Sequence, residues 1–451
     1  MIKKILSTLF IFTASILFGQ TFPLTIIDDS TTSSGITKIT TTDLNNDNFK
    51  DIVISQGYNV SDISFYLNTG EGGFGTKTTI DAEALFAERV ATGDFNNDGW
   101  NDIATITRQT GSVLWYQNTN GNFSDPIVIG TNIPFINDIE VADFDENGSI
   151  DMVVIGQHSI DLFRNDGNGI FIKEAILTTE TSPSILECMY LEKADLDNDG
   201  DIDLIVAETL GPVAYINNGL GIFSPETLQD VMFTTSLVHP FDMDNDGDTD
   251  IFAQDATGQT KWFSNDGEGN FTFVINLFTI PLPVLRSLES IDVNNDGFKD
   301  IYYAYSNKAV YRLNDGNGNF GPESIIYQNT NLFIREVAIE NLNTDNFPDY
   351  IWASMNQTIA YHQNTNTLGN TDLEKNNFII FPNPAKDIVT INFNKLLDAD
   401  LKIITINGQV LKQLKQQHLQ QSITIGDLTN GLYLLQISND KQTSITKIIK
   451  N

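Results

Sequence analysis

Short acidic runs recur along the sequence, with oxygen-bearing side chains at a spacing suited to binding a metal ion. In the run at residues 195–203, DLDNDGDID, such side chains occupy positions 1, 3, 5 and 9, and position 6 is Gly200. Glycine can adopt the left-handed backbone conformation that a sharp turn requires. Hard divalent cations bind several oxygens, and Ca²⁺ accepts an irregular shell of roughly 6–8 of them. The run therefore predicts a loop that wraps one cation with alternate side chains and the carbonyl of position 7.

The chain carries seven such runs, which begin roughly 50 residues apart, and a fixed period of this size is typical of a solenoid, a propeller or an array. The expected ligands are Asp43, Asn45, Asp47 and Asp51; Asp94, Asn96, Asp98 and Asp102; Asp143, Asp145, Asn147 and Asp151; Asp195, Asp197, Asp199 and Asp203; Asp242, Asp244, Asp246 and Asp250; Asp292, Asn294, Asp296 and Asp300; and Asn341, Asn343, Asp345 and Asp349. They predict up to seven Ca²⁺ sites.

The loops are not equivalent. Position 6 is Asn48 in the first loop and Asn346 in the seventh, and Asn also tolerates the left-handed conformation. The seventh loop begins with Asn341 and keeps only two carboxylates, so its site is expected to be the weakest. The loops that begin at Asp195 and Asp242 each carry four carboxylate ligands and are expected to bind most tightly.

The composition is strongly acidic, with a formal net charge of −34 over 451 residues. Seven Ca²⁺ ions would return about 14 positive charges, so filled loops would offset much of this excess. A solvated acidic surface is the alternative interpretation, but it would not concentrate the charge at fixed positions of a repeat. No basic patch is available to meet phosphates, which argues against a nucleic-acid partner. Cys188 is the only cysteine, so an internal disulfide is excluded.

Residues 1–20 have the pattern of a secretory signal, because Lys3 and Lys4 precede an apolar stretch that is short for a membrane span. No later stretch is apolar enough to span a bilayer, so we expect an exported chain without a membrane span. The expected location is the cell surface at the outer membrane, or the extracellular space.

Residues 21–364 repeat a unit of four strand-like segments, with the acidic loop between the first two segments and an Asn at the end of the third. Four strands per repeat of roughly 50 residues fit one blade of a propeller. The seventh unit stops after its third segment, at Asn364, and residues 22–27 resemble the missing fourth one. We therefore predict an all-β, seven-bladed β-propeller in which the N-terminal segment supplies the outer strand of the last blade and closes the ring.

The seven units resemble the FG-GAP and VCBS repeats of integrin α-chain-like propellers, whose blades carry a D-x-D-x-D-G-x-x-D calcium loop between their first two strands. The resemblance covers residues 22–364 and implies that the Asp and Asn side chains named above are Ca²⁺ ligands.

The end of the chain differs in character. Residues 365–376 are polar and rich in turn formers and are predicted to be a linker, whereas residues 377–451 alternate as in a small antiparallel β-sandwich. This last segment resembles the type A sorting domain of the bacterial type IX secretion system, through its Pro382-Asn383-Pro384, its strand that begins Gly431-Leu432-Tyr433, and its lysine-rich terminus. The resemblance implies export through that machinery.

The leading hypothesis is a monomeric, non-catalytic, calcium-stabilised module that binds a glycan or a surface protein or acts in adhesion. The expected binding face is the one opposite the acidic loops, and its candidate residues are Tyr58, Arg108, Phe135, His158, Arg286 and Arg335. An extracellular polysaccharide hydrolase or lyase is the alternative, and a passive matrix component is a third possibility. Catalytic carboxylates would then be sought among Glu140, Glu192 and Glu289, which share the third position before their loops and would line the channel.

Overall fold

The protein divides into two compact units, one of residues 22–364 and one that contains the chain from residue 365 onward. The computed structural model describes residues 22–29, 35–57, 61–70, 72–84, 86–178, 188–228, 233–281, 285–345, 347–355, 358–364, 378–393, 399–405, 410–416, 418–438 and 443–450. The predicted signal and linker lie outside these residues. All regular structure in the described residues is β, and none of it is a helix that could cross a membrane.

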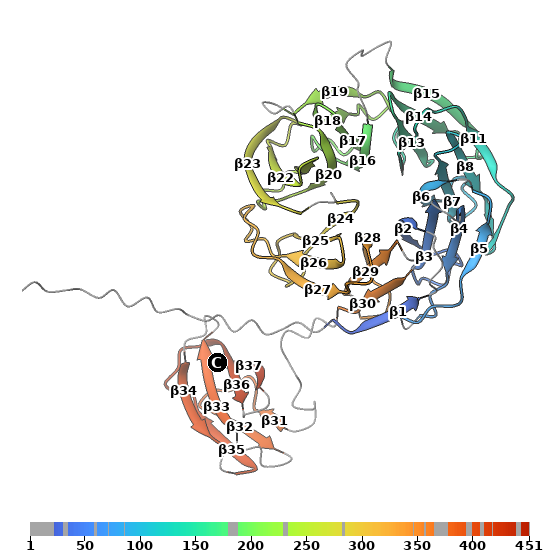
Figure 1. The fold of residues 1–451 in the computed structure, drawn as a ribbon. Helices are drawn as coiled ribbons and strands as arrows, with labels where there is room; N and C mark the ends of the chain where they lie inside the picture. The colour runs from blue at the N-terminus through green and yellow to red at the C-terminus, as the bar shows by residue number, and fades with distance from the viewer. Residues whose placement is uncertain are drawn as a thin grey trace, which may run out of the picture. The chain divides into compact units, whose positions relative to one another are not determined.

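Residues 22–364 form seven four-stranded antiparallel sheets, called blades here, which stand side by side around a ring (Figure 1). From the centre outward, the strands are β2 (Ile36–Thr42), β3 (Asp51–Gly57), β4 (Ser61–Tyr66) and β5 (Thr78–Asp81) in blade 1; β6 (Ala87–Gly93), β7 (Asp102–Thr107), β8 (Ser112–Tyr116) and β11 (Ile127–Gly130) in blade 2; β12 (Asp138–Ala142), β13 (Asp151–Gly156), β14 (Ser159–Asn165) and β15 (Phe171–Thr178) in blade 3; β16 (Cys188–Ala194), β17 (Asp203–Glu208), β18 (Gly211–Ile216) and β19 (Ser224–Thr227) in blade 4; β20 (Thr235–Phe241), β21 (Asp250–Asp255), β22 (Gln259–Asn265) and β23 (Phe271–Thr279) in blade 5; β24 (Leu288–Ile291), β25 (Asp300–Tyr305), β26 (Lys308–Arg312) and β27 (Ser324–Gln328) in blade 6; and β28 (Ile334–Glu340), β29 (Asp349–Ser354), β30 (Ile359–His362) and β1 (Leu24–Asp28) in blade 7. A short ribbon of β9 (Asn118–Thr119) and β10 (Asn122–Phe123) accompanies blade 2.

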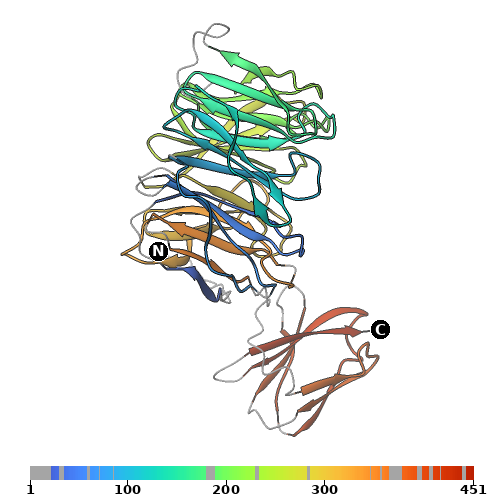
Figure 2. The same ribbon diagram turned by 90° about the vertical axis from the view of Figure 1, so that its right-hand side faces the viewer.

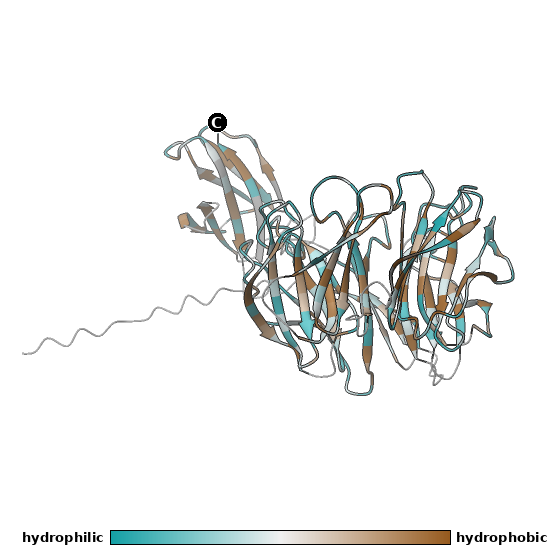
Figure 3. Ribbon diagram, turned by 90° about the horizontal axis from the view of Figure 1, so that it is seen from above, coloured by the Kyte–Doolittle hydropathy of each residue, from teal (hydrophilic) through white to brown (hydrophobic). Residues whose placement is uncertain are grey.

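The second strand of each blade is apolar on both faces because it packs between two neighbouring blades. In β13, Met152 and Val154 belong to one core cluster with Trp115 of blade 2, whereas Val153 belongs to another with Leu204 of blade 4. Successive side chains of a strand point to opposite faces, so the apolar run serves both interfaces in turn. Burying each such side chain contributes about 1.5–3 kcal/mol. Apolar residues accordingly follow the strands, and many connecting loops are hydrophilic (Figure 3).

The ring closes through the N-terminal strand, as the sequence predicted. β1 pairs antiparallel with β30 and places Leu24 opposite His362 and Ile26 opposite Ala360. The pairing continues beyond the strand, because the Gln363 N–H donates to the Pro23 carbonyl at 2.9 Å. Blade 7 is therefore built from both ends of the propeller segment, and its packing against blade 1 completes the circle (Figures 1 and 2).

The C-terminal unit is a small sandwich of two antiparallel sheets, as predicted. One sheet contains β31 (Phe378–Phe381), β32 (Ile388–Phe393) and β35 (Gln420–Thr424); the other contains β34 (Val410–Lys415), β33 (Asp400–Thr405), β36 (Gly431–Ser438) and β37 (Thr443–Lys450). Val389 and Ile391 of the first sheet share one core with Leu401 and Leu435 of the second. Asn383 of the Pro-Asn-Pro motif fixes the last strand, because its amide donates to the Lys447 carbonyl and accepts from the Ile449 N–H, both at 2.8 Å.

Deletion of residues 21–29 should lower the melting temperature of the propeller by about 5 °C or more, because β30 loses its partner strand and becomes an open edge. Deletion of nine residues from the predicted linker, 368–376, is the matched control and should leave that temperature unchanged. Thermal melts followed by circular dichroism measure both effects. Equal melting temperatures for the two deletions would show that the N-terminal strand does not stabilise the ring.

Candidate metal centres

All seven acidic loops lie at the same end of the ring. Each loop joins the first strand of a blade to the second, as the segment between β12 and β13 does in blade 3. The first strands are equivalent and line the centre, so every loop leaves its first strand in the same direction. The turns between the second and third strands, and the connections between blades, lie at the opposite end.

Within each loop, side-chain oxygens hold the backbone in a tight coil. In the second loop, Asp94 accepts the N–H of Asp98 at 3.0 Å on one oxygen and the N–H of Gly99 at 2.8 Å on the other. Asp98 in turn accepts the N–H of Trp100 at 2.9 Å. Gly99 has a φ of +87°, which is costly for residues other than Gly and Asn. Asn48 replaces Gly in the first loop at a φ of +70°, as expected, and Asn346 lies outside the described residues.

The aspartate at position 9 of each loop is fully buried, and its carboxylate accepts hydrogen bonds that hold the loop backbone in place. One of its carboxylate oxygens accepts the N–H of loop position 2 at 2.7–3.2 Å, and the other accepts the N–H of the Asn at the end of the third strand at 2.6–2.9 Å. This holds in all seven blades, for Asp51, Asp102, Asp151, Asp203, Asp250, Asp300 and Asp349. Position 9 therefore has a structural role beyond the ligand role that the sequence suggested.

In blades 1 to 6 the third-strand Asn joins the blade to the preceding one around the ring, a role that the sequence reasoning missed. Asn265 of blade 5 donates through its side-chain amide to the Thr249 carbonyl of its own loop at 2.9 Å and to the Leu196 carbonyl of blade 4 at 2.7 Å. Five other blades repeat both bonds, through Asn68, Asn118, Asn165, Asn217 and Asn314. The bond from Asn68 to the Leu342 carbonyl, at 2.8 Å, extends the series across the closure of the ring. The recurrence of an Asn at the end of every third strand was the available signal.

Carboxylates converge and offer oxygens to a cation at positions 1, 3 and 9 of the third loop and at positions 1, 3 and 5 of the fourth and fifth loops. Three sets have ligand atoms within 4.8 Å of one another: Asp143, Asp145 and Asp151; Asp195, Asp197 and Asp199; and Asp242, Asp244 and Asp246. One oxygen each of Asp195 and Asp244 is buried and makes no hydrogen bond. Buried oxygens without a donor are costly, and a bound cation would satisfy them. The fourth and fifth loops thus fit a divalent cation.

In the other loops, some of the expected ligand oxygens already accept a hydrogen bond or an ion pair from within the protein. In the third loop, the Arg164 guanidinium lies 2.8 Å from the Asp145 carboxylate and already forms an ion pair with this expected ligand. In the first, second and sixth loops the Asn at position 3 donates its amide to the Asp at position 5, as Asn96 does to Asp98 at 2.9 Å. In the seventh loop the Asp345 carboxylate accepts a hydrogen bond from the Gln363 amide at 3.3 Å.

Burial raises the pKa of every position-9 carboxyl above its ordinary value, although the two backbone N–H bonds oppose the shift. The pKa is about 6 or about 7 in these seven groups, Asp51, Asp102, Asp151, Asp203, Asp250, Asp300 and Asp349. Burial and then the neighbouring carboxylates also raise the pKa of Asp197 and Asp244. Each loop therefore concentrates negative charge that a cation would stabilise.

The fold defines the class of the protein as a closed β-propeller with repeated acidic loops. The sequence profile described as FG-GAP-like repeat matches residues 43–105, 94–154, 143–206, 242–287 and 292–352, which together exceed half of the chain. The chain belongs to the FG-GAP-like repeat family, as its resemblance to that family suggested. The profile described as secretion system C-terminal sorting domain matches residues 379–451. This domain marks the chain for the type IX secretion system and for export to the cell surface or extracellular space.

Solved structures show the same fold at low sequence identity. A lectin of Agrocybe aegerita that recognises non-reducing terminal N-acetylglucosamine is 20% identical, with a TM-score of 0.51, over 66% of this chain and 81% of the lectin. BBS1N, solved in complex with ARL6DN, is 12% identical, with a TM-score of 0.51, over 75% of this chain and 94% of its own. PorZ of Porphyromonas gingivalis, a type IX secretion surface component, is 13% identical, with a TM-score of 0.46, over 89% of this chain and 58% of PorZ. The search of curated protein sequences found no match.

Replacing Asn265 with Ala should lower the free energy of unfolding by about 2 kcal/mol or more, because one buried and one partly buried carbonyl lose their donor. Asn270→Ala, at an exposed turn, is the matched control and should change it by less than about 0.5 kcal/mol. Urea unfolding of both variants in the same buffer measures the difference. Equal stability of the two variants would contradict the proposed role of the Asn.

The metal-free protein should become more stable as the pH falls from about 8 to about 5. The position-9 carboxyls have raised pKa values in the folded state, about 6 for Asp51 and about 7 for Asp300. Below these values the native state binds protons that the unfolded chain has already released, and this proton binding stabilises the native state. The stabilisation is lost as the pH rises through 6 to 7. Thermal melts after chelation and gel filtration test this. Asp300→Asn should reduce the slope and the exposed Asp125→Asn should not; a melting temperature that falls with acidification would contradict the assignment.

Proposed function

We propose that this protein is a calcium-stabilised binding module, displayed on the cell surface or released from it, and that it has no catalytic activity. The observation that carries the proposal is the convergence of carboxylates in loops whose backbone is already held in place, with buried oxygens of Asp195 and Asp244 left without a donor. Ca²⁺ would fix the loops at one end of the ring and leave the opposite end for recognition.

Calcium is the cation that best suits these loops. Every side-chain ligand is a carboxylate or an amide oxygen, and none is a histidine or a cysteine, which argues against zinc and softer metals. Mg²⁺ demands near-ideal octahedral geometry and dehydrates reluctantly, whereas Ca²⁺ accepts an irregular shell with bidentate carboxylates. Filled loops would also offset part of the −34 charge.

The opposite end presents aromatic side chains at one repeated position. Phe86, Phe135 and Phe333 lie eight residues before their acidic loops, in blades 2, 3 and 7, and are 41%, 59% and 36% exposed. Phe86 and Phe135 have φ angles of +53° and +48°, a costly conformation for an aromatic residue that is found most often at functional sites. The backbone carbonyls of Phe86 and Phe333 accept an N–H from the neighbouring turn at 2.9 Å, which fixes the loops.

The binding-face residues that we predicted from the sequence differ in their exposure. Arg108, Phe135, His158 and Arg286 are exposed at this end of the ring. Arg335 is only 4% exposed, because it lies on the inner strand β28, so it is not available for surface contacts and that interpretation was wrong. Tyr58 lies outside the described residues. The exposed Phe86, whose carbonyl accepts the Arg108 N–H, suits the apolar face of a sugar or a protein side chain.

In the alternative proposal of a polysaccharide-active enzyme, the glutamates that line the central channel would be the catalytic groups. Glu140 is paired with Lys193 at 3.0 Å, and burial raises the pKa of Glu289 to about 7, a value at which a carboxyl can exchange protons at neutral pH. Incubation of the purified protein with a polysaccharide panel separates the proposals, because turnover that is lost in Glu289→Gln would establish catalysis.

Addition of Ca²⁺ to the chelated protein should raise the melting temperature by about 10 °C, and Mg²⁺ at the same concentration should not. Each site filled at about 100 times its Kd adds about 2.7 kcal/mol, and several sites act together. The Asp197→Asn, Asp199→Asn double variant should show a smaller rise, and Asp125→Asn is the control. A melting curve that does not respond to Ca²⁺ would contradict the proposal of structural calcium.

Binding at the aromatic end should be lost when its side chains are removed. A glycan array and a panel of surface proteins, probed in Ca²⁺, should yield a ligand, with terminal N-acetylglucosamine included because a lectin of the same fold recognises it. Phe135→Ala should weaken that ligand at least about tenfold, since a central aromatic contact is worth about 2 kcal/mol. Ile172→Ala, an exposed position on the outer strand β15, is the control. Retained binding by Phe135→Ala would exclude this surface.

A further inference from the structure

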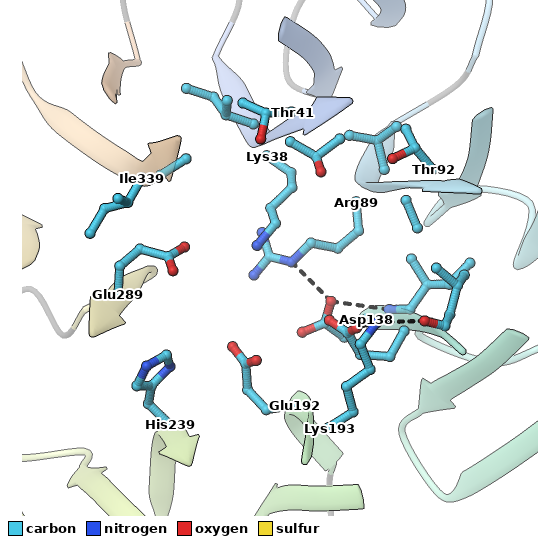
Figure 4. A pocket seen from close by; sticks show the side chains of 18 residues that line it. Lys38, Thr41, Arg89, Thr92, Asp138, Glu192, Lys193, His239, Glu289 and Ile339 are labelled. Carbon is cyan, nitrogen blue, oxygen red and sulfur yellow. Dashed lines mark hydrogen bonds and ion pairs between the residues drawn. The ribbon is translucent and has the colours of Figure 1, made fainter. Parts of the chain in front are cut away.

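A polar cavity of about 280 Å³ lies at the centre of the ring, among the inner strands. Lys38 and Arg89 enter it from one side, and Glu289, His239 and Glu192 enter it from the other (Figure 4). At liquid density the space is enough for about nine waters, so it can hold a small molecule.

Part of the charge in this cavity is already paired within the protein. Arg89 is 4% exposed and lies 3.2 Å from Asp138 and 3.8 Å from Glu336, and it donates to the Thr37 carbonyl at 2.7 Å. On the neighbouring wall, Lys193 lies 3.0 Å from Glu140. These groups form a rigid wall and are not available to a ligand.

Lys38, Glu192 and Glu289 are not paired in this way. Within the described residues, none of the three has an ion-pair partner within 4.0 Å, although Lys38 faces the two carboxyls across the cavity. Burial raises the pKa of Glu289 to about 7, and burial and then Glu140 raise that of Glu192. Burial disfavours the charged form of Lys38, but Glu336 and Glu192 outweigh it and raise the pKa of its ammonium. The cavity thus has the Lys38 ammonium on one side and, on the other, two carboxyls whose charged form a bound cation would stabilise.

His239 provides an independent sign of a missing partner. Its side chain is 92% buried, since its exposed fraction is 8%, and it points into the cavity between Glu192 and Glu289. Its Nε2 contacts the Ser290 hydroxyl at 3.1 Å, but its Nδ1 is buried and makes no hydrogen bond. A buried polar atom without a partner destabilises the protein, and a bound polar group would supply the missing hydrogen bond.

A single metal ion does not fit this arrangement. Glu192, Glu289 and His239 are not among the groups of the described residues whose ligand atoms lie within 4.8 Å of one another. A larger molecule with separated charges does fit, because its dipole would align with the field between Lys38 and the two glutamates.

We propose that the central cavity binds a small zwitterion with a primary ammonium group, of the size of a free amino acid. The ammonium lies between Glu192 and Glu289, the anionic group meets the Lys38 ammonium, and Nδ1 of His239 completes the hydrogen bonding. The three charged groups come from blades 1, 4 and 6, so the site exists only in the closed ring. It is separate from the metal loops and from the aromatic end.

Isothermal titration calorimetry of the full exported chain in Ca²⁺, against the twenty free amino acids, tests the proposal. At least one should bind saturably, and its N-acetyl derivative, which lacks the ammonium, should bind at least about tenfold more weakly. Absence of binding up to about 10 mM for all twenty, or equal binding of the N-acetyl derivative, would overturn the proposal. Neither result bears on the calcium response or on the surface ligand.

Matched variants assign the two ends of the ligand. Lys38→Met should weaken the amino acid at least about tenfold and leave its carboxamide unchanged, because the carboxamide has no anionic group. Glu192→Gln and Glu289→Gln should weaken both compounds, and the exposed Glu268→Gln should weaken neither. The two Gln variants should melt no lower than the parent, since the surroundings already disfavour the charged form of each glutamate. A Lys38→Met variant that weakens both compounds equally would refute the assigned orientation.

Discussion

The buried aspartate at position 9 of each acidic loop is the interaction on which the rest of the propeller depends. One carboxylate receives two backbone N–H groups, one from the loop and one from the end of the third strand, and so fixes three segments of a blade at one point. The Asn that provides the second N–H donates its own side chain to the preceding blade. Hydrogen bonds therefore run from loop to strand to the neighbouring blade around the ring.

This arrangement requires a charged group where the surroundings disfavour charge. Burial raises the pKa of all seven carboxyls, and each loop carries three further Asp or Asn side chains, at positions 1, 3 and 5. A protein built in this way is stable when protons or cations offset the charge. We therefore propose that the buried position-9 aspartate and the calcium site act together in each loop. In this proposal the buried position-9 carboxylate holds the backbone in place, and the more exposed side chains at positions 1, 3 and 5 bind the ion. The surface that we propose for binding lies at the opposite end of the ring.

Much of the fold could be predicted because each unit repeats the same local signals. Alternating apolar segments, Gly-rich turns and the missing fourth segment after Asn364 were enough to predict the blades and the closure by β1. The inter-blade role of the third-strand Asn could not be derived, because its partner carbonyl lies about 70 residues earlier and becomes a neighbour only in the ring. The burial of Arg335 and the pairing of Arg164 with Asp145 depend on which way each side chain points, and the sequence pattern did not show this for these two arginines. The channel position of Glu140, Glu192 and Glu289 followed from their common place before the loops, but their different pairing did not.

The most direct test of the account is the number of calcium ions held by the folded, exported chain. Native mass spectrometry in a calcium-containing volatile buffer should show at least the ions of the fourth and fifth loops, and up to seven. The Asp197→Asn, Asp199→Asn double variant should hold one ion fewer than the parent. A folded chain with no bound calcium under these conditions would contradict the central claim.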